Sequence, residues 1–248
     1  MSDSALIPLI PSINDAAFTA HVQQLLDGKT KPLGSLGVLE QLAMRLACIT
    51  GSDQPVLRDP QMLVFAADHG LAAQGVSAYP ADVTWQMVGN FLAGGAAVSV
   101  LSRLHGVALH VVDCGVNRDF APQPADLPAG APHLWLRKVA HGTQDSSQGP
   151  AMSMAQCEAA IRNGRELLQQ LPGNALLLGE MGIGNTSCAS LLLARLCNMD
   201  VATVTGAGTG LTSEGVARKV AVLQRVQALH HDEHEPLAVL AAMGGLEV

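Results

Sequence analysis

The chain has 248 residues, of which 48% are hydrophobic and only 3% aromatic, and its formal net charge is −7. This length fits one large α/β domain, or one domain with a small annex, whose core must be built mainly from Ala, Leu, Val and Gly. The acidic balance and the scattered Lys and Arg residues exclude a typical nucleic-acid partner, which needs a basic face.

The cysteines and the apolar runs indicate the compartment. Five cysteines form no C-x-x-C pair, so reduced thiols are favoured over a disulfide framework. The first four residues lack the basic region of a signal peptide, and no apolar run is long enough to cross a membrane. We therefore expect a cytoplasmic protein with no membrane partner.

The first part of the chain predicts two helices. Ser12 can cap a helix that runs to about Leu26, with Phe18, Val22 and Leu25 on one face. After a loop, a second helix has one apolar face, made by Leu39, Leu42, Ala43 and Leu46. We assign residues 1–55 to the N-terminal, helical part of a small domain.

The rest of the chain, residues 56–248, alternates apolar strands with helices. The predicted strands cover residues 62–67, 107–112, 134–139 and 175–178. The predicted helices lie near 82–104, 153–171, 186–198, 212–230 and 236–243. Such alternation predicts an α/β fold with three layers, in which a mostly parallel, Rossmann-like sheet carries helices on both faces.

Polar or glycine-rich loops follow three of these strands. They cover residues 68–70, 113–115 and 179–186. Parallel sheets bind ligands at the carboxyl ends of their strands, so the sequence predicts the active site at this edge.

The loop Gly-Glu-Met-Gly-Ile-Gly-Asn-Thr at 179–186 has the composition of an anion site. A buried strand, a glycine turn and a helix N-terminus bring amide groups and the helix dipole together. Against the template of a nucleotide-triphosphate loop, Asn185 stands where that loop needs lysine. This favours a monophosphate, or a lysine supplied from elsewhere in the chain. A purely structural glycine turn is the alternative.

Three other motifs suggest a functional site but are better explained without one. Asp68-His69 suggests a metal or a catalytic dyad, but a satisfied loop histidine is the commoner case. The polar run 230–235 is expected to be a solvated connector. The segment 206–211 resembles a dinucleotide fingerprint, but its third glycine comes one position early, which argues against NAD. We assign no metal and no cofactor.

Four further segments join the anion loop. They are Lys31-Pro32-Leu33-Gly34-Ser35-Leu36-Gly37-Val38-Leu39-Glu40, the run from Phe65 through Asp68-His69-Gly70 and Gly75-Val76-Ser77-Ala78-Tyr79-Pro80 to Gln86-Met87, Asn90 to Ala97, and Val204 to Leu211 with Arg218-Lys219. Together they resemble the nicotinate-nucleotide–dimethylbenzimidazole phosphoribosyltransferases, enzymes of cobalamin assembly. The resemblance runs from about Lys29 to the end of the chain.

The resemblance implies a reaction. Such enzymes transfer phosphoribose from nicotinate mononucleotide to 5,6-dimethylbenzimidazole, giving nicotinate and α-ribazole 5′-phosphate. The positive charge of the nicotinate ring makes it a good leaving group, so orientation for in-line attack would supply most of the rate without a metal. The resemblance also implies a homodimer.

The resemblance implies roles for individual residues. The 5′-phosphate would be bound by Lys219 and by the glycine loops, at Gly182, Ile183, Gly184, Asn185 and Gly208. Glu180 would lie between phosphoribose and base in a supporting catalytic role. The remaining substrate contacts would come from Asp68 and, around the aromatic base, from Ser77, Tyr79, Gln86 and Met87.

The general base of the family is a glutamate in a loop near its C-terminus, which is expected beyond Val248. Glu247 matches a different position and is not assigned as the base. We therefore expect a truncated member, through a natural stop or a partial record. The loss of general-base catalysis would cost about 10²–10⁴-fold in rate. The alternatives are a remnant that only binds nucleotide or dimerises, and a transferase for adenine or phenolic acceptors.

Overall fold

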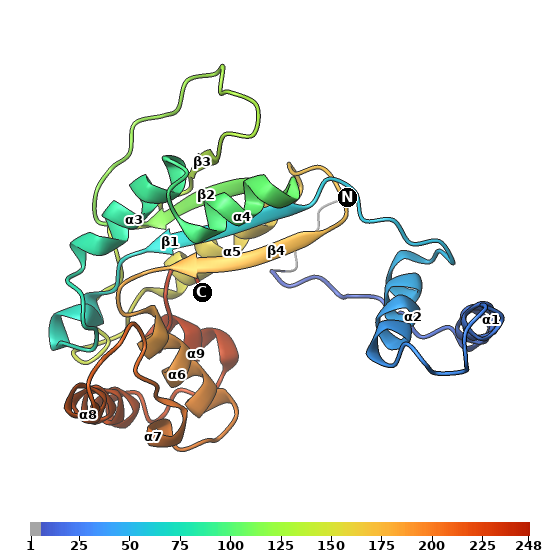
Figure 1. Cartoon of the computed structure of the whole chain (residues 1–248). Helices are drawn as coiled ribbons and strands as arrows, with labels where there is room; N and C mark the ends of the chain where they lie inside the picture. The colour runs from blue at the N-terminus through green and yellow to red at the C-terminus, as the bar shows by residue number, and fades with distance from the viewer. Residues whose placement is uncertain (1–5) are drawn as a thin grey trace. The chain divides into compact units, whose positions relative to one another are not determined.

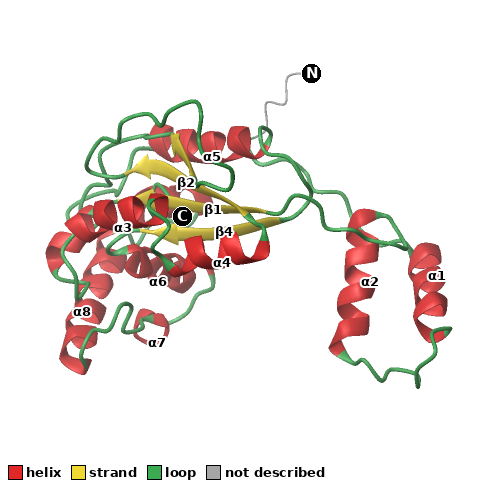
Figure 2. Cartoon of the chain, turned by 45° about the horizontal axis from the view of Figure 1, so that its top comes forward, coloured by secondary structure: helices red, strands yellow, loops and turns green. Residues whose placement is uncertain are grey.

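The computed structural model describes residues 6–248, which form two compact units, one ending at Arg58 and the other spanning Asp59–Val248. The first unit contains α1 (Ala16–Asp27) and α2 (Val38–Thr50), which lie next to each other (Figure 1). They run antiparallel, as Figure 2 shows. Their small core consists of Val22, Leu26 and Ala47, with Phe18, Ala43 and Met44 at its edge.

Asp15, and not Ser12, caps α1, so the sequence prediction was wrong at this point. The Asp15 carboxylate accepts a hydrogen bond from the amide of Phe18 at 2.9 Å. The Ser12 hydroxyl instead accepts from the amide of Asn14, before the helix begins. A carboxylate gains more than a hydroxyl from the positive end of the helix dipole.

The second unit alternates strands and helices along the chain. Its elements are β1 (Gln61–Ala67), the 3₁₀ helix η1 (Gly70–Gln74), α3 (Asp82–Leu92), α4 (Ala97–His105), β2 (Ala108–Gly115), β3 (His133–Leu136), α5 (Met154–Leu168), β4 (Leu176–Met181), α6 (Asn185–Leu196), α7 (Val201–Val204), α8 (Ser213–Leu229) and α9 (Pro236–Met243).

The four strands form one parallel sheet in the order β3-β2-β1-β4, which confirms the predicted α/β fold (Figure 2). Alternate residues of β1 point to opposite faces, as the strand period of two requires. Val64 and Ala66 join a core with α3 and α4 on one face. Leu63 and Ala67 join a core with α5 and α9 on the other. Helices therefore cover both faces of β1. The prediction of a buried strand was wrong for β4, where Leu176, Leu177 and Leu178 are exposed.

The single helix predicted near 82–104 is two helices. The chain breaks between α3 and α4, where Gly94 adopts a left-handed conformation with a φ of 80°. By length and composition alone, Asp82–His105 could cross a membrane, but core helices of soluble proteins pass the same test. The short η1 and α7 were not predicted, because few residues define each of them.

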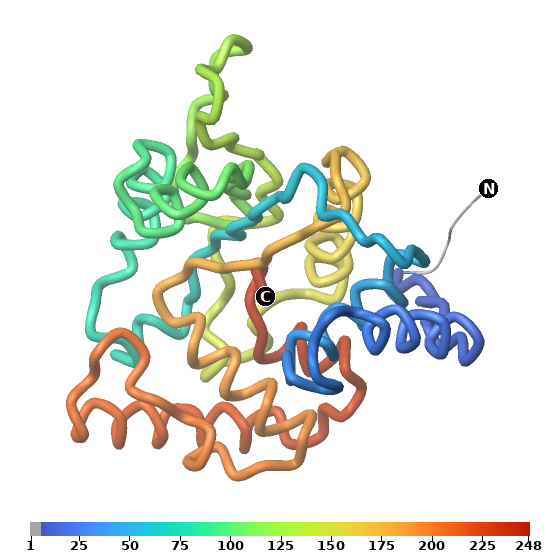
Figure 3. The backbone as a smooth tube through the Cα atoms, turned by 45° about the vertical axis from the view of Figure 1, so that its right-hand side comes forward, coloured from blue at the N-terminus to red at the C-terminus, as the bar shows by residue number. Residues whose placement is uncertain are grey.

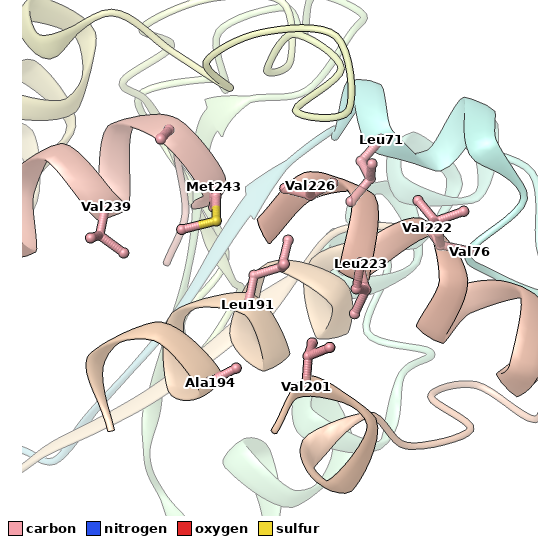
Figure 4. Close-up of a cluster of buried hydrophobic side chains, with 11 residues drawn as sticks. Leu71, Val76, Leu191, Ala194, Val201, Val222, Leu223, Val226, Val239 and Met243 are labelled. Atoms are coloured by element: carbon pink, nitrogen blue, oxygen red, sulfur yellow. The ribbon is translucent and has the colours of Figure 1, made fainter. Parts of the chain in front are cut away.

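A further core fixes the helices that follow β4. It includes Leu191 of α6, Leu223 of α8 and Met243 of α9, which are labelled among its side chains in Figure 4. All three side chains are fully buried. This core sets the position of α8 relative to the first turn of α6.

The C-terminal segment runs from α9 back to the sheet. Figure 3 shows this segment, in red, ending beside the strands. Leu246 packs in the core beside Cys114 and Ala67. The last residues of the chain therefore lie near the carboxyl ends of β1 and β2.

Candidate active site

The turn between β4 and α6 is held in a fixed conformation. Gly184 has a φ of 105°, which a side chain would oppose, and its neighbour Asn185 begins α6. The amide of Asn185 donates to the carbonyl of Gly182 at 3.0 Å. The amide of Ile183 donates to the buried hydroxyl of Thr84 on α3, also at 3.0 Å. Ile183, which we expected to bind phosphate through its amide, therefore uses this group inside the protein.

Lys219 reaches the same turn from α8. Its side chain is fully buried, and its Nζ donates to the hydroxyl of Thr186 at 2.7 Å. Burial lowers the pKa of Lys219 below 10.5, and the neighbouring Cys188 partly offsets this effect. Lys219, from a distant helix, thus brings an amine to the turn in which Asn185 stands at the lysine position of a nucleotide-triphosphate loop.

The loop that contains Gly208 covers this lysine. A Cβ atom on Gly208 would lie 3.1 Å from the Thr186 hydroxyl and 3.7 Å from Lys219 Nζ. The two loops enclose a cavity of about 10 Å³, which is lined by Val76, Ser77, Gly182, Ile183, Gly184, Asn185, Thr186, Ala207, Gly208 and Thr209. A space of this size holds about one water molecule.

Glu180 lies at the end of β4 and is linked to the turn, since Asn185 Nδ2 donates to its carboxylate. Glu180 also lines a separate pocket of about 430 Å³. The walls of this pocket are mostly apolar, and they include Phe65, Met152, Ile161, Leu178 and Leu240. Pockets of this size accept small organic molecules.

The other predicted substrate residues lie in several surroundings. Ser77 lines the small cavity, and its hydroxyl accepts from the amide of Tyr79, whose ring is half exposed. Gln86 is exposed on α3. Met87 packs against the core that contains Val64 and Ala66 of β1. Asp68 is buried, accepts from the amide of Asn117, and lines a polar pocket of about 330 Å³. The structure thus groups Ser77 with the turn between β4 and α6 and places Asp68 in a different pocket.

His69 and Glu247 form a buried pair that sequence reasoning did not assign to the site. His69 Nε2 and Glu247 Oε1 are 2.7 Å apart, and neither side chain has exposed area. Cys188 Sγ lies 3.2 Å from the other ring nitrogen, Nδ1. His69 directly precedes η1, Glu247 follows α9 and Cys188 lies on α6, so no local pattern could reveal the contact. Thr84 could have been found from the sequence, because a threonine on the inward face of a helix needs a hydrogen-bond partner.

The polar run 230–235 contains one buried histidine. His230 is buried and hydrogen-bonded to the carbonyl of Ser146 at 2.9 Å, so the expectation of a solvated connector was wrong at this residue. The Arg195 guanidinium binds three carbonyls of the same segment, which orders it. Within residues 6–248, no group of three His, Cys, Asp or Glu side chains could hold a metal ion.

Comparison with known proteins defines the class of the chain. A family model described as phosphoribosyltransferase matches residues 10–248. A sheet whose carboxyl edge carries a glycine turn and a buried lysine suits such an enzyme, since it must hold a phosphoryl group. The protein is therefore an enzyme of the phosphoribosyltransferase class.

Relatives narrow this class to one family. The chain is 60% identical, over 100% of its length and 69% of the relative's, to nicotinate-nucleotide–dimethylbenzimidazole phosphoribosyltransferase of Variovorax paradoxus. It is 51% identical to the enzyme of the same name from Cupriavidus necator, covering 94% of this chain and 66% of the relative. The chain belongs to the nicotinate-nucleotide–dimethylbenzimidazole phosphoribosyltransferase family.

A solved structure agrees with this assignment. The crystal structure of the enzyme of that name from Thermus thermophilus superposes with a TM-score of 0.85 at 39% identity, covering 94% of this chain and 68% of that one. The chain thus spans about two thirds of the length of these relatives.

Proposed function

We propose that this protein transfers phosphoribose from nicotinate mononucleotide to 5,6-dimethylbenzimidazole, releasing nicotinate and forming α-ribazole 5′-phosphate. The observation that best supports this proposal is the buried Lys219, whose Nζ lies 2.7 Å from the Thr186 hydroxyl at the first turn of α6. A buried ammonium group beside a glycine turn is matched to a phosphate dianion. The family membership supports the two named substrates.

Each part of the site has a task in this reaction. The β4–α6 turn and Lys219 would hold the 5′-phosphate, with Gly208 closing over it. Glu180, held by Asn185, would lie between the ribose and the acceptor. Ser77, at the cavity wall, would begin the acceptor site, which would continue along α3 to Gln86 and Met87. The chain would thereby fix the attacking nitrogen in line with the departing nicotinate.

The biological setting follows from the same proposal. We infer that the enzyme serves the assembly of the cobalamin nucleotide loop in the cytoplasm and acts as a homodimer. The acidic composition and the five free cysteines support a reducing compartment. Sedimentation of the purified protein tests the dimer.

The direct test incubates the purified chain with nicotinate mononucleotide and 5,6-dimethylbenzimidazole and detects products by mass spectrometry. We expect nicotinate and α-ribazole 5′-phosphate, and less product when adenine or a phenol replaces the benzimidazole. Release of nicotinate with adenine or phenol alone would refute the proposed acceptor. Absence of both mononucleotide binding and product would refute the proposed function.

A glycine substitution tests the phosphate loop directly. A Cβ atom on Gly182 would lie 2.4 Å from the carbonyl oxygen of Ala67 and 2.8 Å from His69 Nε2, so Gly182→Ala must displace the turn. We expect mononucleotide affinity to fall by about 10- to 100-fold. Gly149→Ala is the matched control, because its Cβ meets nothing within 4 Å. Unchanged affinity in Gly182→Ala would remove the phosphate from this turn.

A further inference from the structure

The imidazole of His69 occupies space that three glycines leave free. A Cβ atom on Gly182 would lie 2.8 Å from His69 Nε2, and one on Gly184 would lie 3.2 Å from His69 Cβ. A Cβ atom on Gly245 would lie 2.6 Å from His69 Cε1. Two of these glycines belong to the β4–α6 turn, so the ring packs directly against the backbone of the phosphate loop.

Hydrogen bonds fix the orientation of the ring in this space. Nε2 lies 2.7 Å from Glu247 Oε1, and Nδ1 lies 3.2 Å from Cys188 Sγ. Burial alone would lower the pKa of His69, but the interactions with Cys188 and Glu247 outweigh it and raise the pKa well above 6.5. The ring makes one contact through each nitrogen, one to the carboxylate and one to the sulfur, which fixes its plane.

The two hydrogen-bond partners join separate parts of the fold to the loop. Cys188 lies on the first turns of α6, and its position influences the pKa of Lys219 as well as that of His69. Glu247 follows α9 on the C-terminal segment. The ring therefore connects the glycine turn, the helix that begins there and the end of the chain.

We propose that His69 is a positioning residue for the phosphate-binding loop, held in place by Glu247 and Cys188. Resting on the proposed function, this assigns His69 no contact with substrate. Its task is to keep Gly182 and Gly184 at the spacing that binds the phosphoryl group. Loss of the ring leaves a buried gap beneath the turn, into which the glycines can relax.

The test measures binding to the full chain by isothermal titration, with nicotinate mononucleotide and inorganic phosphate as probes. We expect His69→Gln to weaken both by about 10- to 100-fold. In turnover assays, the KM for the mononucleotide should rise while the KM for dimethylbenzimidazole stays the same. His230→Gln is the matched control, since it also replaces a buried, hydrogen-bonded histidine, and its affinities should match the wild type.

A second pair of variants decides the matter if His69→Gln does not fold. Glu247→Gln keeps an oxygen that can accept from His69, whereas Glu247→Leu does not, so the loss of affinity should be larger in the leucine variant. Equal affinities in these two variants, or equal losses in His69→Gln and His230→Gln, would overturn the proposal. A wild-type chain that binds both probes without turnover would refute the proposed function, and the affinities of the variants would still decide the role of His69. A wild-type chain that binds neither probe would overturn both.

Discussion

Lys219 illustrates how a buried charge indicates a ligand at the scale of one residue. Its ammonium group is fully buried, and the partners described for it are the Thr186 hydroxyl and, at 3.5 Å, the carbonyl of Gly206. Neither partner is charged, so desolvation of the ammonium is compensated only in part. An incoming phosphate dianion would supply the missing countercharge.

Replacing Lys219 by methionine should separate binding from stability. We expect Lys219→Met to weaken nicotinate mononucleotide binding by roughly 10- to 100-fold, the value of a hydrogen bond to a charged group. The melting temperature should stay the same or rise, because a buried amine is replaced by an apolar chain of similar length. Arg218→Met, at the exposed neighbouring position, should bind as the wild type does. Titration calorimetry and thermal melting provide both readouts, and equal affinity in the two variants would contradict this role.

His110 gives the fold a defined pH response. Trp135 Nε1 donates to His110 Nδ1 at 3.0 Å, so the ring is neutral and its Nε2 donates to Gln61 Oε1 at 2.7 Å. Burial, and to a lesser degree the charge of His133, lowers the pKa of His110 to about 4. A proton on Nδ1 would face the indole N–H and break this chain of hydrogen bonds across β1, β2 and β3.

The stability of the protein should therefore depend on His110 between pH 6.5 and pH 4. The unfolded chain takes up the proton near pH 6.5, whereas the folded chain does so only near pH 4. Above pH 6.5 the residue has no effect. As the pH falls through this window, the free energy of unfolding should drop by up to about 3 kcal/mol. Urea unfolding at a series of pH values gives the free energy of unfolding of the wild type and of His110→Gln. Between pH 6.5 and pH 4 this free energy should fall more steeply with falling pH in the wild type. The same pH dependence in both proteins would contradict the assignment.

At the scale of elements, one hydrogen bond ties α3 to the phosphate loop. The Thr84 hydroxyl accepts the amide of Ile183, and both groups are buried. Thr84→Val preserves the shape but leaves the amide unsatisfied, so we expect a loss of about 1–3 kcal/mol in unfolding free energy and faster hydrogen exchange at Ile183. Thr203→Val, at an exposed position of α7, should change stability by less than about 0.5 kcal/mol. Unchanged exchange at Ile183 would show that this tether has no role.

The elements themselves were largely predictable from local pattern. The apolar run at 62–67 and the helix at 236–243 appear almost as expected, because burial on both faces and a proline start leave clear signals. The break between α3 and α4 was missed, since the helical pattern continues on both sides of Gly94 and Gly95. The cap of α1 was missed because Ser12 and Asp15 are both good capping residues.

At the scale of the whole molecule, the sequence predicted the glycine turn at the carboxyl edge of the sheet but not the contacts around it. The position of the glycine turn follows from one continuous segment, and the parallel sheet places that turn beside the carboxyl end of β1. The pair His69 and Glu247 joins residues 178 positions apart, and Lys219 meets Thr186 across 33. Such contacts depend on how α6, α8 and α9 pack, which no local pattern encodes.

Binding of nicotinate mononucleotide should raise the free energy of unfolding of the α/β unit, Asp59–Val248. Both tryptophans, Trp85 and Trp135, lie in the unit Asp59–Val248, which also contains the phosphate loop, so their fluorescence reports its unfolding. At 100 times its Kd, nicotinate mononucleotide should add about 2.7 kcal/mol to the free energy of unfolding. For a unit of this size, that corresponds to a rise of roughly 5–10 °C in melting temperature. Lys219→Met should show a much smaller shift at the same ligand concentration. An equal shift in both proteins would mean that the mononucleotide stabilises the fold from a site other than this one.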